Sequence, residues 1–340
     1  MPAPSTRSRL GAGWWIALGL LTVMVLVAAG FVCVGAWSLS RVLSQVEQIP
    51  HAFPAAEADR PPALTGEAAK AQNILVLGSD TRGPTVQGTL ADMSGQHSDT
   101  IMVVHVPADR RNIYVMSILR DSSLTVPGHG NAKISDALSW GGVPLAVQTV
   151  EGLLDVRMDH VAVVDFGGFE GVTDALGGVD IHNPVDFMAS HLAGHHFAKG
   201  NLHLNGQEAL AFGRERDAYR DDDFQRVRNQ QLLIKALFGR LGQGRVLLNP
   251  GKVGNVLDAL APHLAVDEGL DLAYLASSGW KLRDIRSGNI TFFTMPAKGT
   301  GAKGHGKAIV DVDWDKLPGV KTAFQTDTLG SYRPEVQTVG

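Results

Sequence analysis

The segment LNGQEALAFGRERDAYRDDDFQRVRNQQLLIKAL, residues 204–237, places a dense run of charge between two amphipathic helical patterns. Asn205 can cap the first helix, and Glu208 follows at the spacing of a capping box. Three consecutive aspartates, 221–223, bring negative charge to the start of a second helix, where the helix dipole favours it. The segment therefore predicts two helices that are joined by a charged turn.

The second of these helices carries polar residues on its apolar face. Arg226 and Gln230 fall at helical spacing with Leu233 and Leu237, which are expected to face the core. An arginine in that position needs an anionic partner, because an unpaired buried charge is costly. The charge pattern alone slightly favours a helix pair in which neighbouring acids neutralise the arginines, and the alternative is a site for an anionic ligand.

The composition of the whole chain sets broad limits. The chain has 340 residues, of which 44% are hydrophobic, and a formal net charge of −4. This length suits one large or two medium domains, and the charge gives no general reason to expect nucleic acid as a partner. The single cysteine, Cys33, excludes intramolecular disulfides and zinc clusters built on several cysteines.

The N-terminal region predicts a membrane anchor. No charged residue occurs between Leu10 and Ser40, and residues 14–38 are long enough to cross a hydrocarbon layer about 30 Å thick. Two arginines precede this transmembrane segment, so the positive-inside tendency places a tail, residues 1–13, in the cytoplasm and the rest of the chain outside. A cleaved signal peptide is the competing interpretation, but the apolar run is longer than a signal peptide usually has.

The remaining chain alternates between strand-like and helix-like periods. Residues 39–71, rich in proline, alanine and charge, are expected to be a membrane-proximal linker. Strands are predicted at residues 73–77, 100–106, 113–119, 160–166, 179–182 and 290–295. With helices between them, these strands predict an α/β fold, a three-layer α/β/α domain with a mixed central sheet, over residues 72–324. A C-terminal tail, residues 325–340, would follow.

Two glycine-rich segments, residues 83–97 and 298–307, lack an apolar period and are expected to be loops. The second interleaves lysines with glycines, but their order does not match GxxxxGK[ST], so it does not predict a nucleotide-binding loop. A GxSxG motif is absent as well. The chain therefore favours direct transfer from an already activated donor.

Polar residues stand at the ends of three predicted strands. Asp80 follows the strand at 73–77, Asp99 precedes the one at 100–106, and Arg120 follows the one at 113–119. An isolated aspartate at such a position is more often a turn or cap residue than a ligand. Two carboxylates that approach each other can, however, hold Mg²⁺ together with water and phosphate oxygens. Arginines bind phosphate oxygens bidentately, so the combination predicts a diphosphate site beside an apolar groove.

An ordered set of motifs resembles the LytR-CpsA-Psr family over about residues 72–295. The motifs are GSDTR at 78–82, SDT at 98–100, SILRD at 117–121, GGV at 177–179, LNGQEALAF with two following arginines at 204–216, and DDDFQRVRNQQ at 221–231. A membrane anchor with the catalytic domain outside the cell membrane is also the layout of that family.

The resemblance implies a phosphotransferase that moves a glycopolymer from a polyprenyl-diphosphate carrier to peptidoglycan, at the 6-hydroxyl of N-acetylmuramic acid. Asp80 and Asp99 would hold Mg²⁺ or Mn²⁺, and one of them would assist deprotonation of the acceptor. The diphosphate would be bound by Arg82, Arg120, Arg214, Arg216, Arg226 and Gln230. The catalytic set would be Asp80, Asp99, Arg120 and Arg226, and the prenyl chain would lie between sheet and helices against Leu233 and Leu237.

This chain departs from the pattern of the family at two positions. His97 stands where the family commonly has an arginine, and a neutral imidazole is a weaker phosphate ligand at neutral pH. Leu119 stands where proline is usual, which affects the rigidity of the strand end. Arg214 and Arg216 reach one site only if their helix ends there, since residues two apart on a helix point in different directions.

Two alternative functions use the same residues. The first is hydrolysis of the lipid diphosphate, with water as the acceptor. The second is a non-catalytic receptor or scaffold for polyprenyl lipids, although lipid binding alone would need no aspartate pair. The sequence leaves the polymer open among teichoic acid, arabinogalactan and capsular polysaccharide. The expected partners are the lipid-linked glycopolymer, peptidoglycan and the membrane, and no nucleic acid.

Overall fold

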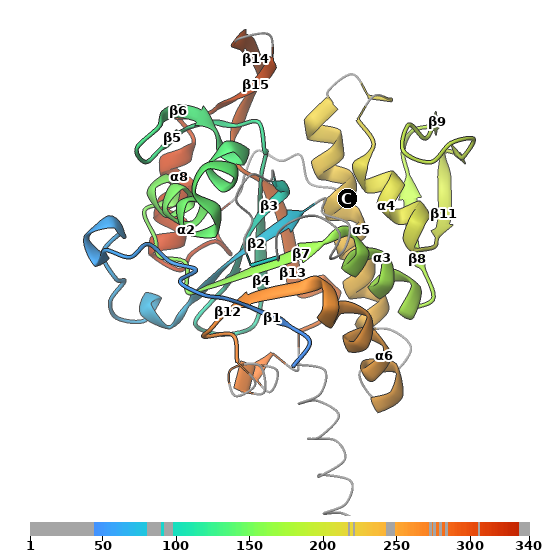
Figure 1. Ribbon diagram of the computed structural model, residues 1–340, viewed down its shortest axis with the longest axis horizontal. Helices are drawn as coiled ribbons and strands as arrows, with labels where there is room; N and C mark the ends of the chain where they lie inside the picture. The colour runs from blue at the N-terminus through green and yellow to red at the C-terminus, as the bar shows by residue number, and fades with distance from the viewer. Residues whose placement is uncertain are drawn as a thin grey trace, which may run out of the picture. The chain divides into compact units, whose positions relative to one another are not determined.

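The computed structural model describes residues 44–79, 90–91, 98–216, 218–219, 222–242, 249–271, 285–304 and 307–332, together with 274, 277–278 and 281–282. One compact unit spans Gln45–Gly340. At its centre lies a seven-stranded sheet in the order β1-β12-β7-β2-β3-β4-β13 (Figure 1).

The central sheet is mixed, as predicted. Strand β2 runs antiparallel to β3 and parallel to β7, and β4 runs antiparallel to β3 and parallel to β13. Strand β12 is antiparallel to β7 and parallel to β1. The strands are β1 (Glu47–Ile49), β2 (Gln72–Ser79), β3 (Ser98–Val106), β4 (Ile113–Ile118), β7 (His160–Asp165), β12 (Leu264–Asp267) and β13 (Ile290–Thr294).

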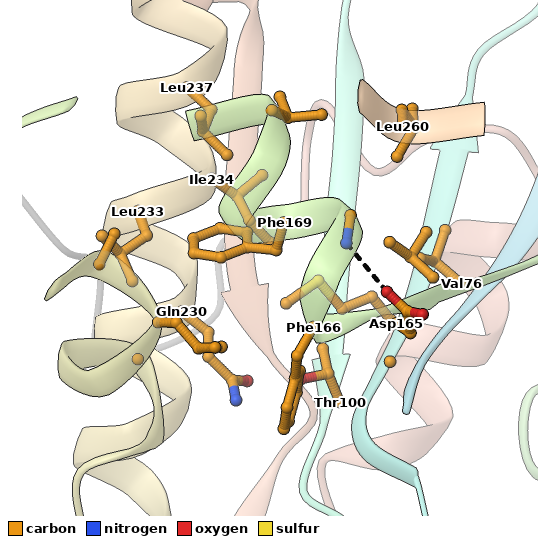
Figure 2. Close-up of a pocket in the computed structure, with 18 of the residues that line it drawn as sticks. Val76, Thr100, Asp165, Phe166, Phe169, Gln230, Leu233, Ile234, Leu237 and Leu260 are labelled. Atoms are coloured by element: carbon orange, nitrogen blue, oxygen red, sulfur yellow. Dashed lines mark hydrogen bonds between the residues drawn. The ribbon is translucent and has the colours of Figure 1, made fainter. Parts of the chain in front are cut away.

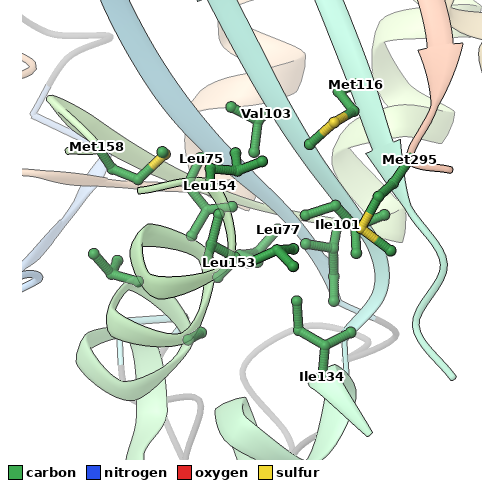
Figure 3. Close-up of a cluster of buried hydrophobic side chains, with 14 of the residues drawn as sticks. Leu75, Leu77, Ile101, Val103, Met116, Ile134, Leu153, Leu154, Met158 and Met295 are labelled. Atoms are coloured by element: carbon green, nitrogen blue, oxygen red, sulfur yellow. The ribbon is translucent and has the colours of Figure 1, made fainter. Parts of the chain in front are cut away.

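Helices cover both faces of the sheet (Figure 1). One face carries α2 (Ile134–Leu154) and α8 (Leu317–Gln325), and the other carries α3 (Phe166–Ala175), α4 (Gly206–Arg214), α5 (Asp222–Gly242) and α6 (Pro250–Leu260). Under α2, apolar side chains of β2 and β3 such as Leu75 and Val103 pack against Leu153 and Leu154 (Figure 3). Burial of this apolar surface is the main force that holds the layers together.

The helix α2 is broken in its middle. Gly141 and Gly142 have non-helical backbone angles, and Gly142 has a φ of 62°, which favours glycine. The sequence predicts two helices here, at 133–140 and 144–154, and the break separates two helical pieces at nearly those bounds.

Two secondary-structure predictions differ from the structure. Of the segment 298–307, the described residues lie in paired strands rather than a loop, in β14 (Ala297–Gly304) and β15 (Lys307–Val312). Its glycines hide the strand period, but Val310 and Val312 are buried and anchor β15. The strand predicted at 179–182 is β8 (Val179–Asn183), which pairs with β11 (Gly200–Leu204) outside the central sheet. Further short strands are β5 (Ser123–Val126), β6 (Gly130–Lys133), β9 (Phe187–Met188) and β10 (His196–Phe197).

The segment predicted to be a linker contributes to the domain. Strand β1 belongs to the central sheet, and Ile49 lies in the main core. Arg60 forms an ion pair with the fully buried Glu151 at 2.5 Å and donates to the Met158 carbonyl at 2.7 Å. The compact unit therefore begins well before residue 72, because these contacts join residues that are far apart in the sequence.

The structure describes part of the predicted C-terminal tail but none of the predicted transmembrane segment. The transmembrane segment, residues 14–38, lies outside the described residues. Within the part of the chain that the structure describes, no helix is long and apolar enough to cross a membrane. Part of the predicted C-terminal tail is packed, since Leu329 is buried in the main core.

Candidate active site

Asp99 lies at an irregularity in the pairing of β2 with β3. Gly78 pairs with Thr100 and Ser79 pairs with Ser98, so Asp99 is an extra residue in the ladder. An extra residue of this kind bends the strand and redirects its side chain. A Cβ atom on Gly78 would lie 2.8 Å from Cβ of Thr100, so the close pairing beside Asp99 requires glycine.

Arg120 follows β4 and forms an ion pair with Asp99. Both side chains are partly exposed, at 23% for Arg120 and 18% for Asp99. The Nε atom of Arg120 is buried and has no hydrogen-bond partner among the described residues. An anionic ligand at this site would satisfy that donor, because a buried polar group without a partner is costly.

Asp121 connects three basic side chains at the end of β4. Its Oδ1 lies 2.7 Å from Nζ of Lys133, and its Oδ2 lies 3.9 Å from Nε of Arg120 and 3.8 Å from Nη2 of Arg216. Sequence reasoning did not assign a role to Asp121 or Lys133. Asp121 could have been suspected from the SILRD motif, where it adjoins Arg120. Lys133 could not, because its position beside Asp121 depends on the hairpin β5–β6.

The helix α4 ends between Arg214 and Arg216, and the two side chains have different neighbours. The helix ends at Arg214, and Glu215 has extended backbone angles, with φ −61° and ψ 132°. The guanidinium of Arg214 lies over the ring of Phe166, with its Cζ 4.8 Å from the ring centroid, a favourable cation–π arrangement. Arg216 approaches Asp121 instead. The helix end that a shared site for these two arginines would require is therefore present.

Glu215, between the two arginines, ties the end of α4 to Ser190, which lies between β9 and β10. Its side chain is fully buried and accepts hydrogen bonds from the amide and the hydroxyl of Ser190, at 2.9 and 2.8 Å. Burial acts to raise the pKa of Glu215, but hydrogen bonds from Ser190 and from the Ala218 and Arg216 amides hold that pKa below its usual range. The ionised carboxylate therefore fixes the turn that follows α4, through the amides of Arg216 and Ala218.

Two buried amide side chains fix the rotation of α5. Gln231 donates to the hydroxyl oxygens of Ser117 and Thr294, at 2.9 and 3.2 Å, and thereby ties the helix to β4 and β13. Asn229 donates to the carbonyl of Phe212 and the hydroxyl of Tyr219. Arg226 is only 3% exposed. These contacts fix the orientation of α5 and thereby that of the face that carries Gln230 and the two predicted leucines.

That face lines a cavity of about 360 Å³ between the sheet and the helices α3, α4 and α5 (Figure 2). Gln230, Leu233, Ile234 and Leu237 line it from α5, at the spacing of one helical stripe. The opposite walls come from β2, β3, β7 and α3, and they are mostly apolar. Arg214, Gln230 and Thr100 supply polar groups to the same cavity. Pockets that bind small ligands have this combination of apolar walls and few polar groups.

Asp165 is a further residue of the cavity wall that the sequence did not reveal. It ends β7 and caps α3 by accepting from the Gly168 amide at 2.9 Å (Figure 2). Its other oxygen lies 2.9 Å from Nδ1 of His263. The signal in the sequence was an aspartate at the boundary of a strand and a helix. Its histidine partner lies 98 positions further along the chain, and no local pattern connects the two.

The other predicted site residues lie outside the described residues, namely Asp80, Arg82 and His97. Among the described residues, no group of three or more histidine, cysteine, aspartate or glutamate side chains could hold a metal ion. Asp99 nevertheless suits Mg²⁺, because this ion is commonly held by only one or two carboxylates, with water and phosphate oxygens as its other ligands.

Comparisons with known proteins give a consistent result. Residues 44–325 match the model of the LytR_cpsA_psr family. The chain is 31% identical over 271 residues to the polyisoprenyl-teichoic acid–peptidoglycan teichoic acid transferase TagU of Bacillus mycoides, covering 79% of this chain and 83% of that protein. It is 29% identical over 303 residues to the cell wall biosynthesis protein LcpA of Corynebacterium glutamicum, covering 78% of this chain and 57% of that protein.

Solved structures share the fold. The crystal structure of B. subtilis TagV is similar with a TM-score of 0.63 and 24% identity, covering 79% of this chain and 100% of that chain. A protein from Streptococcus agalactiae is similar with a TM-score of 0.67 and 19% identity, covering 81% of this chain and 94% of that chain. Because the family model matches most of this chain, the chain belongs to the LytR_cpsA_psr family.

Proposed function

We propose that this protein transfers a glycopolymer from a polyprenyl-diphosphate carrier to peptidoglycan. The observation that carries the proposal is the position of Arg214, which lines the apolar cavity and stands two residues from Arg216 in the cluster around Asp121. A site of this kind suits an amphiphile with an anionic head and a long apolar tail. The names of TagU and LcpA, which concern a teichoic acid transferase and cell wall biosynthesis, support the same assignment.

The diphosphate of the donor would lie among the arginines. Arg120, Arg214 and Arg216 would neutralise its oxygens, together with Arg226 and Gln230 on α5 and, as the motif GSDTR implies, Arg82. Guanidinium groups suit this role because they bind phosphate oxygens bidentately. The first isoprene units would enter the cavity beside Leu233 and Leu237, whose burial against a hydrocarbon chain is favourable.

The reaction is a displacement at the phosphorus that carries the glycopolymer. The hydroxyl oxygen of the acceptor, which we propose to be the 6-hydroxyl of N-acetylmuramic acid, forms a bond to that phosphorus. The bond from phosphorus to the bridging oxygen breaks, and polyprenyl monophosphate leaves. The hydroxyl proton passes to a carboxylate, for which Asp99 and Asp80 are the candidates. The arginines stabilise the charge that develops on the leaving phosphate.

We assign the metal to Asp99 and Asp80. A bound Mg²⁺ or Mn²⁺ would neutralise charge on the diphosphate. Arg120 would orient Asp99 through the ion pair between them. We also propose that residues 14–38 anchor the chain in the cell membrane, with the domain on the outer side, because the run of apolar residues is long enough to span it.

A transfer assay with the full chain in lipid nanodiscs tests the proposal. The donor carries a labelled glycopolymer on polyprenyl diphosphate, and peptidoglycan oligomers serve as acceptors, with Mg²⁺ or with EDTA. We expect label on the oligomers that is lost with EDTA and reduced at least about 100-fold in Arg214→Ala, since an electrostatic contact of this type contributes about 2.7–4 kcal/mol. Arg111→Ala, on the turn at the opposite end of β3 and β4, is the control. Absence of label on every oligomer with the wild-type chain would refute the proposal.

A further inference from the structure

An exposed aromatic pair lies outside the machinery described so far. The rings of Trp140 and His129 are stacked, with centroids 4.5 Å apart and an interplanar angle of 26°. Trp140 is 47% exposed, so part of its indole is open to a ligand. The stack orders the indole before any ligand arrives.

The fold connects this pair directly to the candidate active site. Strand β5 starts two residues after Asp121, and β6 returns at Lys133, whose ammonium group pairs with Asp121. The helix α2 then begins, and the amide of Ser135 donates to the carbonyl of Arg120 at 3.2 Å. Trp140 is the last residue before the break in α2, about 9 Å along the helix from Ile134 at 1.5 Å per residue.

We propose that Trp140, held by His129, is a platform for a sugar ring of the peptidoglycan acceptor, an inference that rests on the proposed function. One face of a pyranose ring consists of C–H groups, which pack against an aromatic surface while the hydroxyls at the ring edge remain in water. Because the indole is already ordered by His129, binding costs little side-chain entropy.

The arrangement of the two faces of the sheet favours the acceptor over the donor. In an in-line displacement at phosphorus, the attacking and leaving oxygens lie on opposite sides. The leaving polyprenyl phosphate belongs to the cavity beside α3, α4 and α5, on one face of the sheet. An acceptor on the opposite side would approach from the face that α2 covers, and α2 carries Trp140 (Figure 1).

Steady-state transfer by the full chain in nanodiscs tests the platform, with peptidoglycan oligomers and the lipid-linked donor varied separately. Trp140→Ala should raise KM for the oligomers about five- to tenfold, as expected for the loss of one aromatic contact, and leave KM for the donor within about twofold. Trp140→Phe should retain most of the affinity. Trp314→Ala is the matched control, because Trp314 is the other exposed indole among the described residues, at 54% exposure.

Three results would overturn the inference while leaving the transferase intact. They are an unchanged KM for the oligomers in Trp140→Ala, a shift in KM for the donor instead, and an equal shift in Trp314→Ala. Calorimetric binding of the oligomers without donor provides a second readout. It should weaken by the same factor in Trp140→Ala, at an unchanged unfolding temperature, and it tests the platform even if the wild-type chain proves to transfer nothing.

Discussion

Asp99 and Arg120 face each other across the ends of neighbouring strands and form an ion pair. Ile101 pairs with Ile118 in the antiparallel ladder of β3 and β4, and two further steps along that register bring Asp99 opposite Arg120. Cross-strand neighbours of opposite charge stabilise each other. The same geometry puts a carboxylate and a guanidinium side by side at the end of the sheet where the candidate cavity begins.

Removal of Arg120 should abolish transfer without unfolding the protein. Arg120→Ala deletes a phosphate contact and the partner of Asp99, so we expect kcat/KM to fall at least about 100-fold. Both side chains keep some contact with solvent, so loss of the pair should cost less than the roughly 3–5 kcal/mol of a fully buried pair, and the variant should remain folded. Transfer assays together with thermal unfolding check both statements, and full activity of the variant would contradict the site assignment.

A polar residue in the cavity should weaken donor binding. Leu237→Gln places an amide against the apolar wall, which costs about 1–3 kcal/mol without a partner, so KM for the polyprenyl donor should rise about 5- to 100-fold. Lys235→Gln is the matched control, because Lys235 is exposed on the same helix. Equal donor KM values for the two variants would show that the prenyl chain does not occupy this cavity.

The C-terminal contact of Asp327 should make stability depend on pH. Burial acts to raise the pKa of Asp327, but hydrogen bonds from His105 and from the Ala108 amide lower that pKa below its usual range. Because the folded pKa is the lower one, the stabilisation is complete above the unfolded pKa of about 4 and is lost as pH falls through the folded pKa.

Asp327→Asn tests this statement with little backbone strain, since Asp327 has a φ of 55° and asparagine tolerates that conformation. Urea unfolding between neutral pH and pH 3 should show that wild type is more stable than the variant at neutral pH and that the difference shrinks on acidification. A difference that stays constant over this range would refute the assignment.

The contact between Arg60 and Glu151 should be essential for stability. Glu151 is fully buried and accepts from Arg60 and from the Met158 amide. Arg60→Ala leaves that carboxylate without its cation, and we expect a loss of about 3–5 kcal/mol in the free energy of unfolding, as for other broken buried pairs. Arg111→Ala, on an exposed turn, should have almost no effect in the same urea titration. Equal stability of both variants would mean that residues 45–71 do not support the domain.

The strands of the central sheet could be predicted where apolar residues form continuous runs. This applies to β2, β3, β4, β7 and β13. Each end of these strands lies within two residues of its predicted position. Strand β1 could not be predicted, because three residues carry no period and their pairing with Ala265–Asp267 joins distant parts of the chain. The hairpin β14–β15 could not be predicted either, because the glycines of β14 leave it without an apolar period.

The candidate site was predictable in its components and less so in its geometry. Helical spacing placed Gln230, Leu233 and Leu237 on one face, and the structure has all three lining one cavity. The extra residue at Asp99 depends on the pairing of two strands, and the contact of Asp165 with His263 depends on tertiary packing. Local sequence patterns do not contain this information. The roles that the family resemblance implies for these residues stay predictions.

The most direct test of the central claim is a product analysis of a single reaction of the full chain with donor, peptidoglycan oligomers and Mg²⁺. Mass spectrometry of the oligomers and chromatography of the lipids would measure both products together. If the protein is a transferase, each polyprenyl monophosphate released is matched by one glycopolymer joined through a phosphate to muramic acid. Release of polyprenyl monophosphate with the glycopolymer free in solution would contradict it and identify a hydrolase, and neither product would favour a lipid receptor.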